Sequence, residues 1–298
     1  MGTTETSPDR LIPVFDLRVT PEDLDAVAQT LRSGWLTMGP RTLEFEAEFA
    51  RSIGARYAVA VSSCTAALHL AYLAAGIGPG DEVIVPSYTM AATAAAVLYA
   101  GGTPVFADIV GLEHPMVDVE HVEELITPRT RAVVVVHFGG YAATVDRLAD
   151  LCAAREIALI EDAAHTPMAT LGGRSLGTFG LAGAFSFFSN KVLAAGEGGL
   201  LATDDPEVAA FARSRRSHAM TRSSWDRHQG GAEEYDVPAL GFNYRIDEPR
   251  AALLLSRLRR LADDVARRRE LTLRYRELLK EVPGLIIPFS DESVATSC

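Results

Sequence analysis

The chain has 298 residues, which is enough for one large domain or two smaller ones. Hydrophobic residues make up 48% and charged residues 22%, which is ordinary for a globular protein that folds in water. The formal net charge of −11 argues against nucleic acid as the main partner.

The cysteines and the apolar runs bear on where the protein works. Cys64, Cys152 and Cys298 form neither a CxxC pair nor an even set, which is typical of a reducing cytoplasm and argues against a structural metal site. The polar N-terminus has no apolar signal core. The longest apolar run, 90–100, is too short to span a membrane and predicts a core helix. We therefore expect a cytoplasmic protein without a membrane partner or a bound metal.

The first half of the chain alternates between predicted strands and helices. Thr20 and Pro21 predict the first helix start, since threonine caps helices and proline suits their first turn. Alternation with continuous apolar strands is typical of a parallel sheet covered on both faces. Residues 1–20, which precede the first predicted helix, are expected to form a flexible arm. In chain order we predict helices over 21–32 and 40–53, a strand over 57–61, a helix over 66–75, a strand over 82–86, a helix over 90–100, a strand over 104–109, a helix over 119–126, a strand over 132–136, a helix over 145–156 and a strand over 157–160.

The second half is less regular. Residues 166–183 are glycine-rich and predict a loop, and a strand leads into Lys191. A further strand is predicted over 200–203 and a helix after the Asp205 cap. A long helical region is predicted over 249–280, followed by a strand-like piece over 282–289.

Ligands of parallel sheets bind at the carboxyl ends of the strands, so the residues there are the candidates for a site. At one such end, 62–65 reads Ser-Ser-Cys-Thr and opens a helix, where free N–H groups and hydroxyls suit a phosphate, or where a hydroxyl simply caps the helix. At another, Glu161 and Asp162 could hold a cationic heterocycle or a metal, or form a buried cap or salt bridge. His137 could be a site residue or a hydrogen-bonded polar group at a strand end.

A third strand end leads to a lysine in a chain where nearly every cation is arginine. Only Lys191 and Lys280 are lysines among 28 Lys and Arg residues. A desolvated lysine can become a neutral amine and form a Schiff base, which arginine cannot do. The alternative is a lysine whose ammonium group extends from the strand end into water. A basic cluster over 213–228 likewise has two interpretations, a loop that binds an anion or a face exposed to solvent.

Together the three strand ends suit one ligand, pyridoxal 5′-phosphate (PLP), which requires a phosphate cradle, a carboxylate for its ring nitrogen and a lysine for its aldehyde. Other cofactor motifs are weak or absent. The Gly-rich segment 76–80 follows a helix and precedes a strand, which is the reverse of a dinucleotide fingerprint. The sequence contains no GxxxxGK[ST], no GxSxG and no HExxH.

Several blocks of the sequence, in a consistent order, resemble the DegT/DnrJ/StrS-type PLP-dependent aminotransferases, which mostly act on nucleotide-linked keto sugars. The resemblance runs from about residue 11 to the C-terminus. Its most specific blocks are TAALHL at 65–70, GIGPGDEVIVPS at 76–87, EDAAH at 161–165, FSF at 185–187 with Lys191, GEGG at 196–199 and GFNYRIDE at 241–248.

The resemblance implies a role for each candidate residue. Lys191 would form the Schiff base and move the proton, and Asp162 would pair with the ring nitrogen. His165 would lie on the side of the ring hydroxyl. Cys64 and Thr65 at the helix start, together with Ser186, would hold the phosphate; Met90 would lie on the ring face; and Asn243 would reach the phosphate of a neighbouring subunit, which implies a homodimer with shared active sites.

This chain departs from the family at three points. Cys64 and Met90 stand where relatives usually carry glycine and an aromatic residue. Relatives also continue through a complete small C-terminal domain, whereas this sequence ends near the start of one. The resemblance thus implies the α/β fold-type-I fold, a mostly parallel sheet flanked by helices, with an arm (1–20), a large PLP-binding domain (21–250), and a helical connection with the start of a truncated small domain (251–298).

The expected function is transfer of an amino group from glutamate or glutamine to a keto group of a nucleotide-activated deoxysugar. Some relatives are dehydratases with histidine in place of the lysine, and Lys191 argues against that branch. The alternative is a non-catalytic binding or regulatory protein that keeps the same fold. A response of the bound cofactor to glutamate would separate the two.

Overall fold

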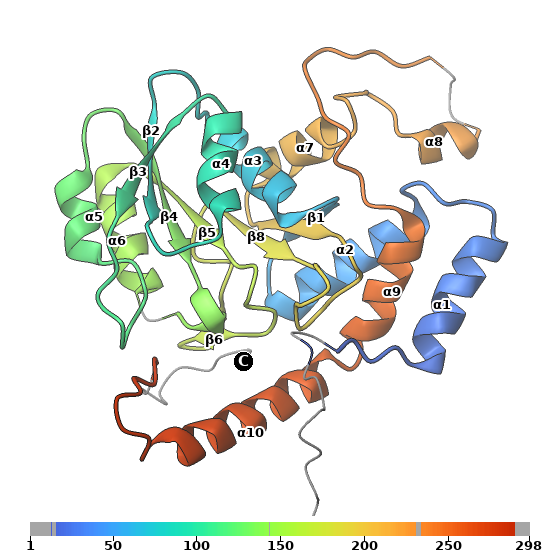
Figure 1. Cartoon of the computed structure of the whole chain (residues 1–298). Helices are drawn as coiled ribbons and strands as arrows, with labels where there is room; N and C mark the ends of the chain where they lie inside the picture. The colour runs from blue at the N-terminus through green and yellow to red at the C-terminus, as the bar shows by residue number, and fades with distance from the viewer. Residues whose placement is uncertain (1–12, 14–15, 143, 231–233, 290–298) are drawn as a thin grey trace, which may run out of the picture.

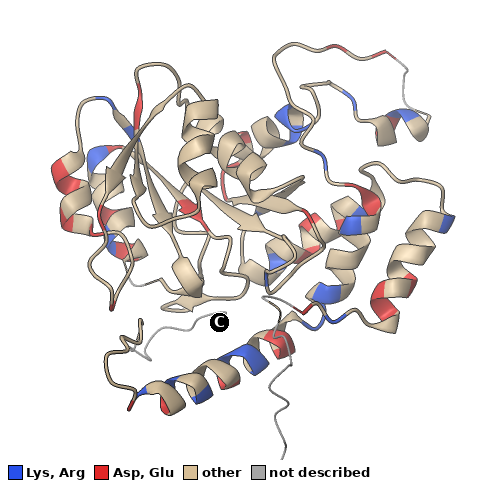
Figure 2. Cartoon of the chain, viewed as in Figure 1, with Lys and Arg blue, Asp and Glu red and all other residues tan. Residues whose placement is uncertain are grey.

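The computed structural model describes residues 13, 16–142, 144–230 and 234–289, so the predicted arm and the segment after Phe289 lie largely outside the described residues. Figure 1 shows a central twisted sheet with helices on both faces, and α10 (Leu261–Leu279) lying along one side of the molecule. Acidic and basic residues lie mainly on the outer helices and few lie on the central strands (Figure 2). None of the helices in the described ranges is both long enough and apolar enough to cross a bilayer.

In the described part of the chain the central sheet has seven strands in the order β1-β9-β8-β5-β4-β2-β3. All neighbouring pairs are parallel except those of β9, which runs antiparallel to both β1 and β8. The predicted mostly parallel α/β sheet is therefore confirmed. The strands are β1 (Tyr57–Val61), β2 (Glu82–Pro86), β3 (Thr103–Ala107), β4 (Thr130–Val136), β5 (Ala158–Asp162), β8 (Ala182–Ser186) and β9 (Gly199–Thr203).

Helices cover both faces of this sheet. One face carries α3, α4 and α7, and the other carries α2 and α9 near β1 and α5 and α6 near β4. Besides α10, the helices of the described residues are α1 (Pro21–Arg32), α2 (Pro40–Ile53), α3 (Cys64–Ala74), α4 (Ala91–Tyr99), α5 (Val119–Leu125), η1 (Phe138–Gly140), α6 (Val145–Arg155), α7 (Pro206–Arg215), α8 (Ser224–His228) and α9 (Glu248–Leu258). A small hairpin is formed by β6 (Thr170–Leu171) and β7 (Arg174–Ser175).

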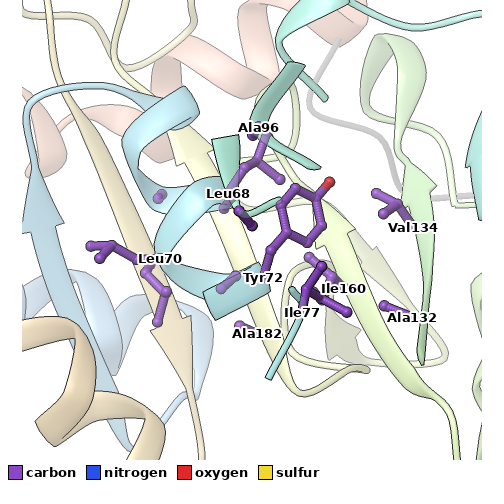
Figure 3. Packing of buried hydrophobic residues seen from close by; sticks show 14 of the residues in the cluster. Leu68, Leu70, Tyr72, Ile77, Ala96, Ala132, Val134, Ile160 and Ala182 are labelled. Carbon is purple, nitrogen blue, oxygen red and sulfur yellow. The ribbon is translucent and has the colours of Figure 1, made fainter. Parts of the chain in front are cut away.

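The core between α3, α4 and the sheet is built on small residues around one large ring. Figure 3 shows the ring of Tyr72 among Ala96, Val134 and Ile160, all of which are fully buried or nearly so. Because α4 is rich in alanine, it lies close to α3 and the sheet, and the Tyr72 hydroxyl reaches the Thr93 carbonyl at 3.0 Å. This contact fixes the first turn of α4 beside the end of β5.

On the opposite face, aromatic residues bring distant parts of the chain together. Phe49 of α2 packs edge-on against Phe185 and Phe187, with ring centroids 5.0 Å and 5.7 Å away. Edge-to-face packing of this kind stabilises a core beyond the area it buries. It holds the segment that leaves β8 for Lys191.

A buried carboxylate ties α2 to α9. Glu248 is 1% exposed and accepts hydrogen bonds from the N–H groups of Gly39, Arg41 and Thr42 at 2.7–2.9 Å, and from the Thr42 hydroxyl at 2.6 Å. The first N–H groups of a helix have no partner within it, so a carboxylate is well placed there. The N-terminus of α2 is thus capped by a side chain from the far end of the sequence.

One prediction about the elements is refined by the structure, and two are wrong. The helical region 249–280 is two helices that join at Arg259 and Arg260, because the chain turns there and returns Leu261 and Val265 to the core. Residues 282–289 form turns rather than a strand, and the loop predicted over 166–183 contains the β6–β7 hairpin and the start of β8. The predicted division into domains at residue 250 stays a prediction.

Candidate active site

Every predicted site residue except Asn243 lines one cavity of about 500 Å³. The cavity lies at the carboxyl ends of β4, β5 and β8, where Val136 is aligned with Asp162 and Asp162 with Ala184. The position agrees with the rule that ligands of open parallel sheets bind at these ends. The predicted residues that line it are Cys64, Thr65, Met90, Asp162, His165, Ser186 and Lys191.

One wall is the N-terminus of α3. Ser63 caps the helix, and its hydroxyl accepts from the Ala66 N–H at 3.1 Å. The N–H groups of Cys64 and Thr65 stand in the first turn, where the helix offers no acceptor, so they are suited to bind an anion. A helix start was predicted at 66 and lies at Cys64, so the cradle is part of the helix.

Ser186 is brought to this wall by the glycine that begins β9. Ser186 is paired with Gly199 across β8 and β9. A Cβ on Gly199 would lie 2.2 Å from the Ser63 carbonyl carbon and 2.4 Å from the Cys64 nitrogen, so only glycine permits this approach. The Ser186 hydroxyl and the first turn of α3 therefore belong to one polar wall.

The two acids at the end of β5 point in opposite directions. The Glu161 carboxylate is fully buried and accepts from the N–H groups of Gly177, Phe179 and Gly180 at 2.5–2.8 Å, and it lies 2.9 Å from His137 Nε2. Asp162 lines the cavity instead. Glu161 thus has the structural role of the two, and Asp162 is the carboxylate that a ligand could reach.

Lys191 does not stand at the end of the strand as predicted. β8 ends at Ser186, and Lys191 lies in the loop between β8 and β9, with its N–H donating to the Phe188 carbonyl at 2.9 Å. The loop is closed by the Phe187 N–H, which donates to the Gly198 carbonyl at 2.9 Å. The glycine turn predicted after the lysine therefore folds the loop back and holds Lys191 at the cavity.

Charges in the cavity shift the nearby titratable groups. Burial lowers the pKa of His165, and the positive charge of Lys191 adds to this effect against the opposing influence of Asp162. Burial also raises the pKa of the Cys64 thiol, as does Asp162, while Lys191 opposes the change. The imidazole is therefore neutral and the thiol protonated at neutral pH.

His165 lies within a group of aromatic residues at the cavity. Its Nδ1 accepts from the Gly139 N–H at 3.2 Å, which leaves the proton on Nε2. Its ring lies 5.6 Å from Phe138, which in turn lies 4.6 Å from Tyr88. Tyr88 and Phe138 both line the cavity and supply an apolar wall for a flat ligand.

Met90 and Asn243 are exposed, whereas the other predicted site residues are buried or half-buried. Met90 is the N-cap residue of α4, and 75% of its surface is exposed at the cavity rim. Asn243 is exposed and does not appear among the described residues that line the cavity. Its neighbour Tyr244 accepts from the Ser62 N–H at 2.8 Å, so Asn243 lies on a segment that runs beside the start of α3.

The structure also bears on the alternatives left open for His137 and for the basic cluster 213–228. His137 lines the cavity but is fully buried, and its Nε2 contact with Glu161 agrees with a polar group held at a strand end. In the predicted basic cluster, Arg216 is buried against Glu46 and the Ala60 carbonyl, and Arg215 binds the Leu240 carbonyl. These arginines support the fold, and within the described residues no member of the cluster lines the cavity.

Sequence reasoning missed Thr93, which is fully buried and donates to Asp162 Oδ2 at 2.8 Å. Its partner Thr89 also lines the cavity. A signal was available, because Thr93 interrupts a run of alanines in a helix that follows a strand end. A hydroxyl in so apolar a helix requires a partner when it is buried.

Comparison with known proteins identifies the family of this chain. The model of the DegT/DnrJ/EryC1/StrS aminotransferase family matches residues 18–297. The chain belongs to this family. The predicted resemblance is thereby confirmed, and so are the prediction of an enzyme and its class, an aminotransferase.

Individual members of the family match most of the chain. The spore coat polysaccharide biosynthesis protein SpsC of Bacillus subtilis is 45% identical over 270 residues, which are 90% of this chain and 69% of SpsC. The crystal structure of the aminotransferase TlmJ from Streptoalloteichus hindustanus is 38% identical, with a TM-score of 0.89 over 96% of this chain and 76% of that one. The PMP form of Spr1654 from Streptococcus pneumoniae, a putative sugar aminotransferase, is 27% identical, with a TM-score of 0.89 over 96% and 77% of the two chains.

These relatives connect the family to sugars and polysaccharides. The aminotransferases of the family depend on PLP, and Spr1654 has also been solved in a PLP form. For this chain, the comparisons support membership of a family of sugar aminotransferases.

Proposed function

We propose that this aminotransferase uses PLP to move an amino group from glutamate or glutamine to a keto group of a nucleotide-activated deoxysugar. The single observation that carries the proposal is the cavity, which gathers an amine from Lys191, a carboxylate from Asp162 and the first turn of α3. When bound, PLP supplies an electron sink for the carbon that carries the transferred amine. The amino acid becomes a 2-oxo acid, and the sugar carbonyl becomes an amine.

The residues present fit this cofactor. The N–H groups of Cys64 and Thr65 and the hydroxyl of Ser186 suit its phosphate, since they form one polar wall around Gly199. Asp162 suits a protonated ring nitrogen, because a buried carboxylate has its strongest interaction with a positive partner. The amine of Lys191 suits the aldehyde.

The remaining side chains would orient the reaction. Lys191 would take and return a proton at the reacting carbon, since it lines the cavity in which that carbon would lie. His165 would donate from Nε2 to an oxygen on its side of the ring, since its Nδ1 is occupied by Gly139. Met90, Tyr88 and Phe138 would exclude water from the ring face, because all three line the same cavity.

Asn243 supports a homodimer with shared sites. It is exposed, and it is not one of the described residues that line the cavity of its own chain. We infer that it serves the cavity of a second subunit, where its amide would meet the phosphate. The site would then be complete only in the dimer.

The first experiment compares the two lysines. Purified protein with added PLP should show a visible absorption band that changes when glutamate is added. Lys191→Arg should abolish the band, because a guanidinium cannot form the covalent bond. Lys280→Arg should leave it unchanged, because Lys280 is exposed and pairs with Glu277 at 2.8 Å.

Two outcomes would contradict the proposal. Folded wild-type protein without any band would exclude PLP, and a Lys191→Arg variant with an undiminished band would exclude the lysine. Incubation of the glutamate-treated protein with nucleotide-linked keto sugars, followed by mass spectrometry, then tests the acceptor. A product in which an amine replaces the carbonyl oxygen is expected for a deoxysugar, and its absence across such sugars would overturn that substrate class.

A further inference from the structure

The carboxylate of Asp162 is held by a short chain of hydroxyl groups. Thr93 Oγ1 lies 2.8 Å from Asp162 Oδ2, and Thr89 Oγ1 lies 2.8 Å from Thr93 Oγ1. Thr93 is fully buried and Asp162 is 5% exposed, whereas Thr89 lines the cavity. The chain therefore runs from the cavity surface to the buried carboxylate.

The direction of these hydrogen bonds follows from the number of protons. An ionised carboxylate only accepts, so the single hydroxyl proton of Thr93 points to Asp162. Thr93 then has none left for Thr89, and Thr89 must donate to Thr93. Each hydroxyl thus polarises the next in the direction of the carboxylate.

The other contacts of Asp162 leave room for one more partner. Oδ1 accepts from the Ala164 N–H at 3.2 Å and lies 4.0 Å from Cys64 Sγ. A carboxylate has about four lone-pair positions, so one is left after these two contacts and the one from Thr93. This remaining position is the one that a ligand in the cavity could use.

Thr93 itself is fixed by its surroundings. The Tyr72 hydroxyl donates to the Thr93 carbonyl at 3.0 Å, and the Thr93 N–H donates to the Met90 carbonyl at 3.0 Å. Tyr72 is fully buried in the core shown in Figure 3. The Thr93 hydroxyl is therefore attached to a well-packed part of the fold, where it donates to Asp162 Oδ2.

We propose that Thr93, supported by Thr89, is a positioning residue that keeps the Asp162 carboxylate directed at the ligand of the cavity. The inference rests on the proposed function, since the partner of Asp162 is taken to be the ring nitrogen of PLP. Without the hydroxyl, Oδ2 of a buried carboxylate loses its donor, and the group can rotate away from that partner.

Thr93→Val tests this inference, because valine keeps the shape of threonine and removes the hydroxyl. We expect PLP to bind about tenfold more weakly, and the pH dependence of its visible band to shift, because a hydrogen bond to a charged group is lost. Thr93→Ser restores the hydroxyl and should bind PLP as the wild type does. Thr89→Val should have a smaller effect, and the double valine variant should be no worse than Thr93→Val alone.

Thr30→Val is a matched control. Thr30 is also buried in a helix, and its hydroxyl donates to the Ala26 carbonyl at 3.0 Å, but it belongs to α1. It should change thermal stability without changing PLP affinity or the pH dependence. Unfolding of the protein without PLP, measured for all variants, separates loss of fold from loss of orientation.

The outcomes distinguish this inference from the function on which it rests. Wild-type protein that binds no PLP overturns both. Wild-type protein that binds PLP, with Thr93→Val matching it in affinity and pH dependence, overturns the positioning role alone. A Thr93→Ser variant as weak as Thr93→Val would also overturn it, because the effect would not come from the hydroxyl. If Thr93→Val does not fold, then Thr93→Ser and Thr89→Val decide, and a Thr89→Val protein identical to the wild type overturns the inference.

Discussion

At the residue scale, Gly199 shows how a missing side chain can shape a binding wall. The first residue of β9 lies directly against the first turn of α3, and the atoms that a Cβ would meet belong to the backbone of Ser63 and Cys64. Backbone of this kind cannot move aside as a flexible side chain can. The position of the proposed phosphate cradle therefore depends on the absence of one methyl group.

Gly199→Ala should displace the helix start from Ser186. We expect the variant to lose about 1–3 kcal/mol of unfolding free energy through overpacking and to bind PLP more weakly. Urea unfolding and a PLP titration measure the two effects. Gly111→Ala is the control, since a Cβ there meets nothing within 4 Å. Equal behaviour of the two variants would contradict the close approach.

At the scale of elements, a buried carboxylate of α1 joins this helix to the junction of α9 and α10. Asp23 is fully buried and accepts from Arg260 at 2.6 Å and 2.8 Å and from the Ser256 hydroxyl at 2.8 Å. Burial alone would raise the pKa of Asp23, but the hydrogen bonds from Arg260, Thr20 and Ser256 outweigh it and lower the pKa to about 2. The carboxylate thus stabilises the fold only when it is ionised.

This shift predicts a dependence of stability on pH. The pKa of Asp23 in the folded protein is below that of an unfolded aspartate. Its contribution to the free energy of unfolding is therefore complete above about pH 4 and is lost as the pH falls to about 2. Asp23→Asn should cost about 2 kcal/mol near neutral pH. Urea midpoints of wild type and variant should converge in acid, while the exposed Asp25→Asn should match the wild type throughout. A gap that persists in acid would exclude the ionised carboxylate as its cause.

Elements with regular patterns were predictable from the sequence, and the loops that carry the chemistry were less so. α1, α2, β1 and β2 begin and end where their caps and apolar runs indicate. The break at Arg260 was not predictable, because the apolar spacing continues through it and the Asp23 carboxylate that holds it comes from the far end of the chain. The loop position of Lys191 was missed for a similar reason, since Phe187 looks like part of a strand but contacts Phe49 of α2.

At the scale of the whole molecule, the proposed function predicts a site that is shared between two subunits. Lys191 and Asp162 line one cavity, and Asn243 is not among the described residues that line it. The region of the site could be predicted from the sequence because ligands bind at the carboxyl ends of parallel strands, whereas the choice of Asp162, His165, Met90 and Asn243 came from the family resemblance. Which side chains actually meet in one chain depends on the tertiary structure. The contact between Thr93 and Asp162 could not be predicted from the sequence for that reason.

Subunits with complementary defects can test the shared site. A heterodimer of a Lys191→Ala chain and an Asn243→Ala chain, isolated with two different tags, should contain one intact site of two. It should therefore give about half of the wild-type response of bound PLP to glutamate. Each parent homodimer should respond less. A heterodimer that is no better than the average of its parents would show that Asn243 serves its own chain.

The carboxylate of Glu248 has a consequence for how the chain acquires its fold. The N-terminus of α2 has no capping side chain of its own, and the N–H groups of Gly39 and Thr42 can donate only to water until residue 248 arrives. β1 likewise pairs with β9, which begins at Gly199. During synthesis, β1 and α2 can therefore reach these contacts only after residues 199 and 248 have left the ribosome. Contacts this distant along the sequence make folding slow, and the open edge of β1 is the surface that a chaperone would need to protect.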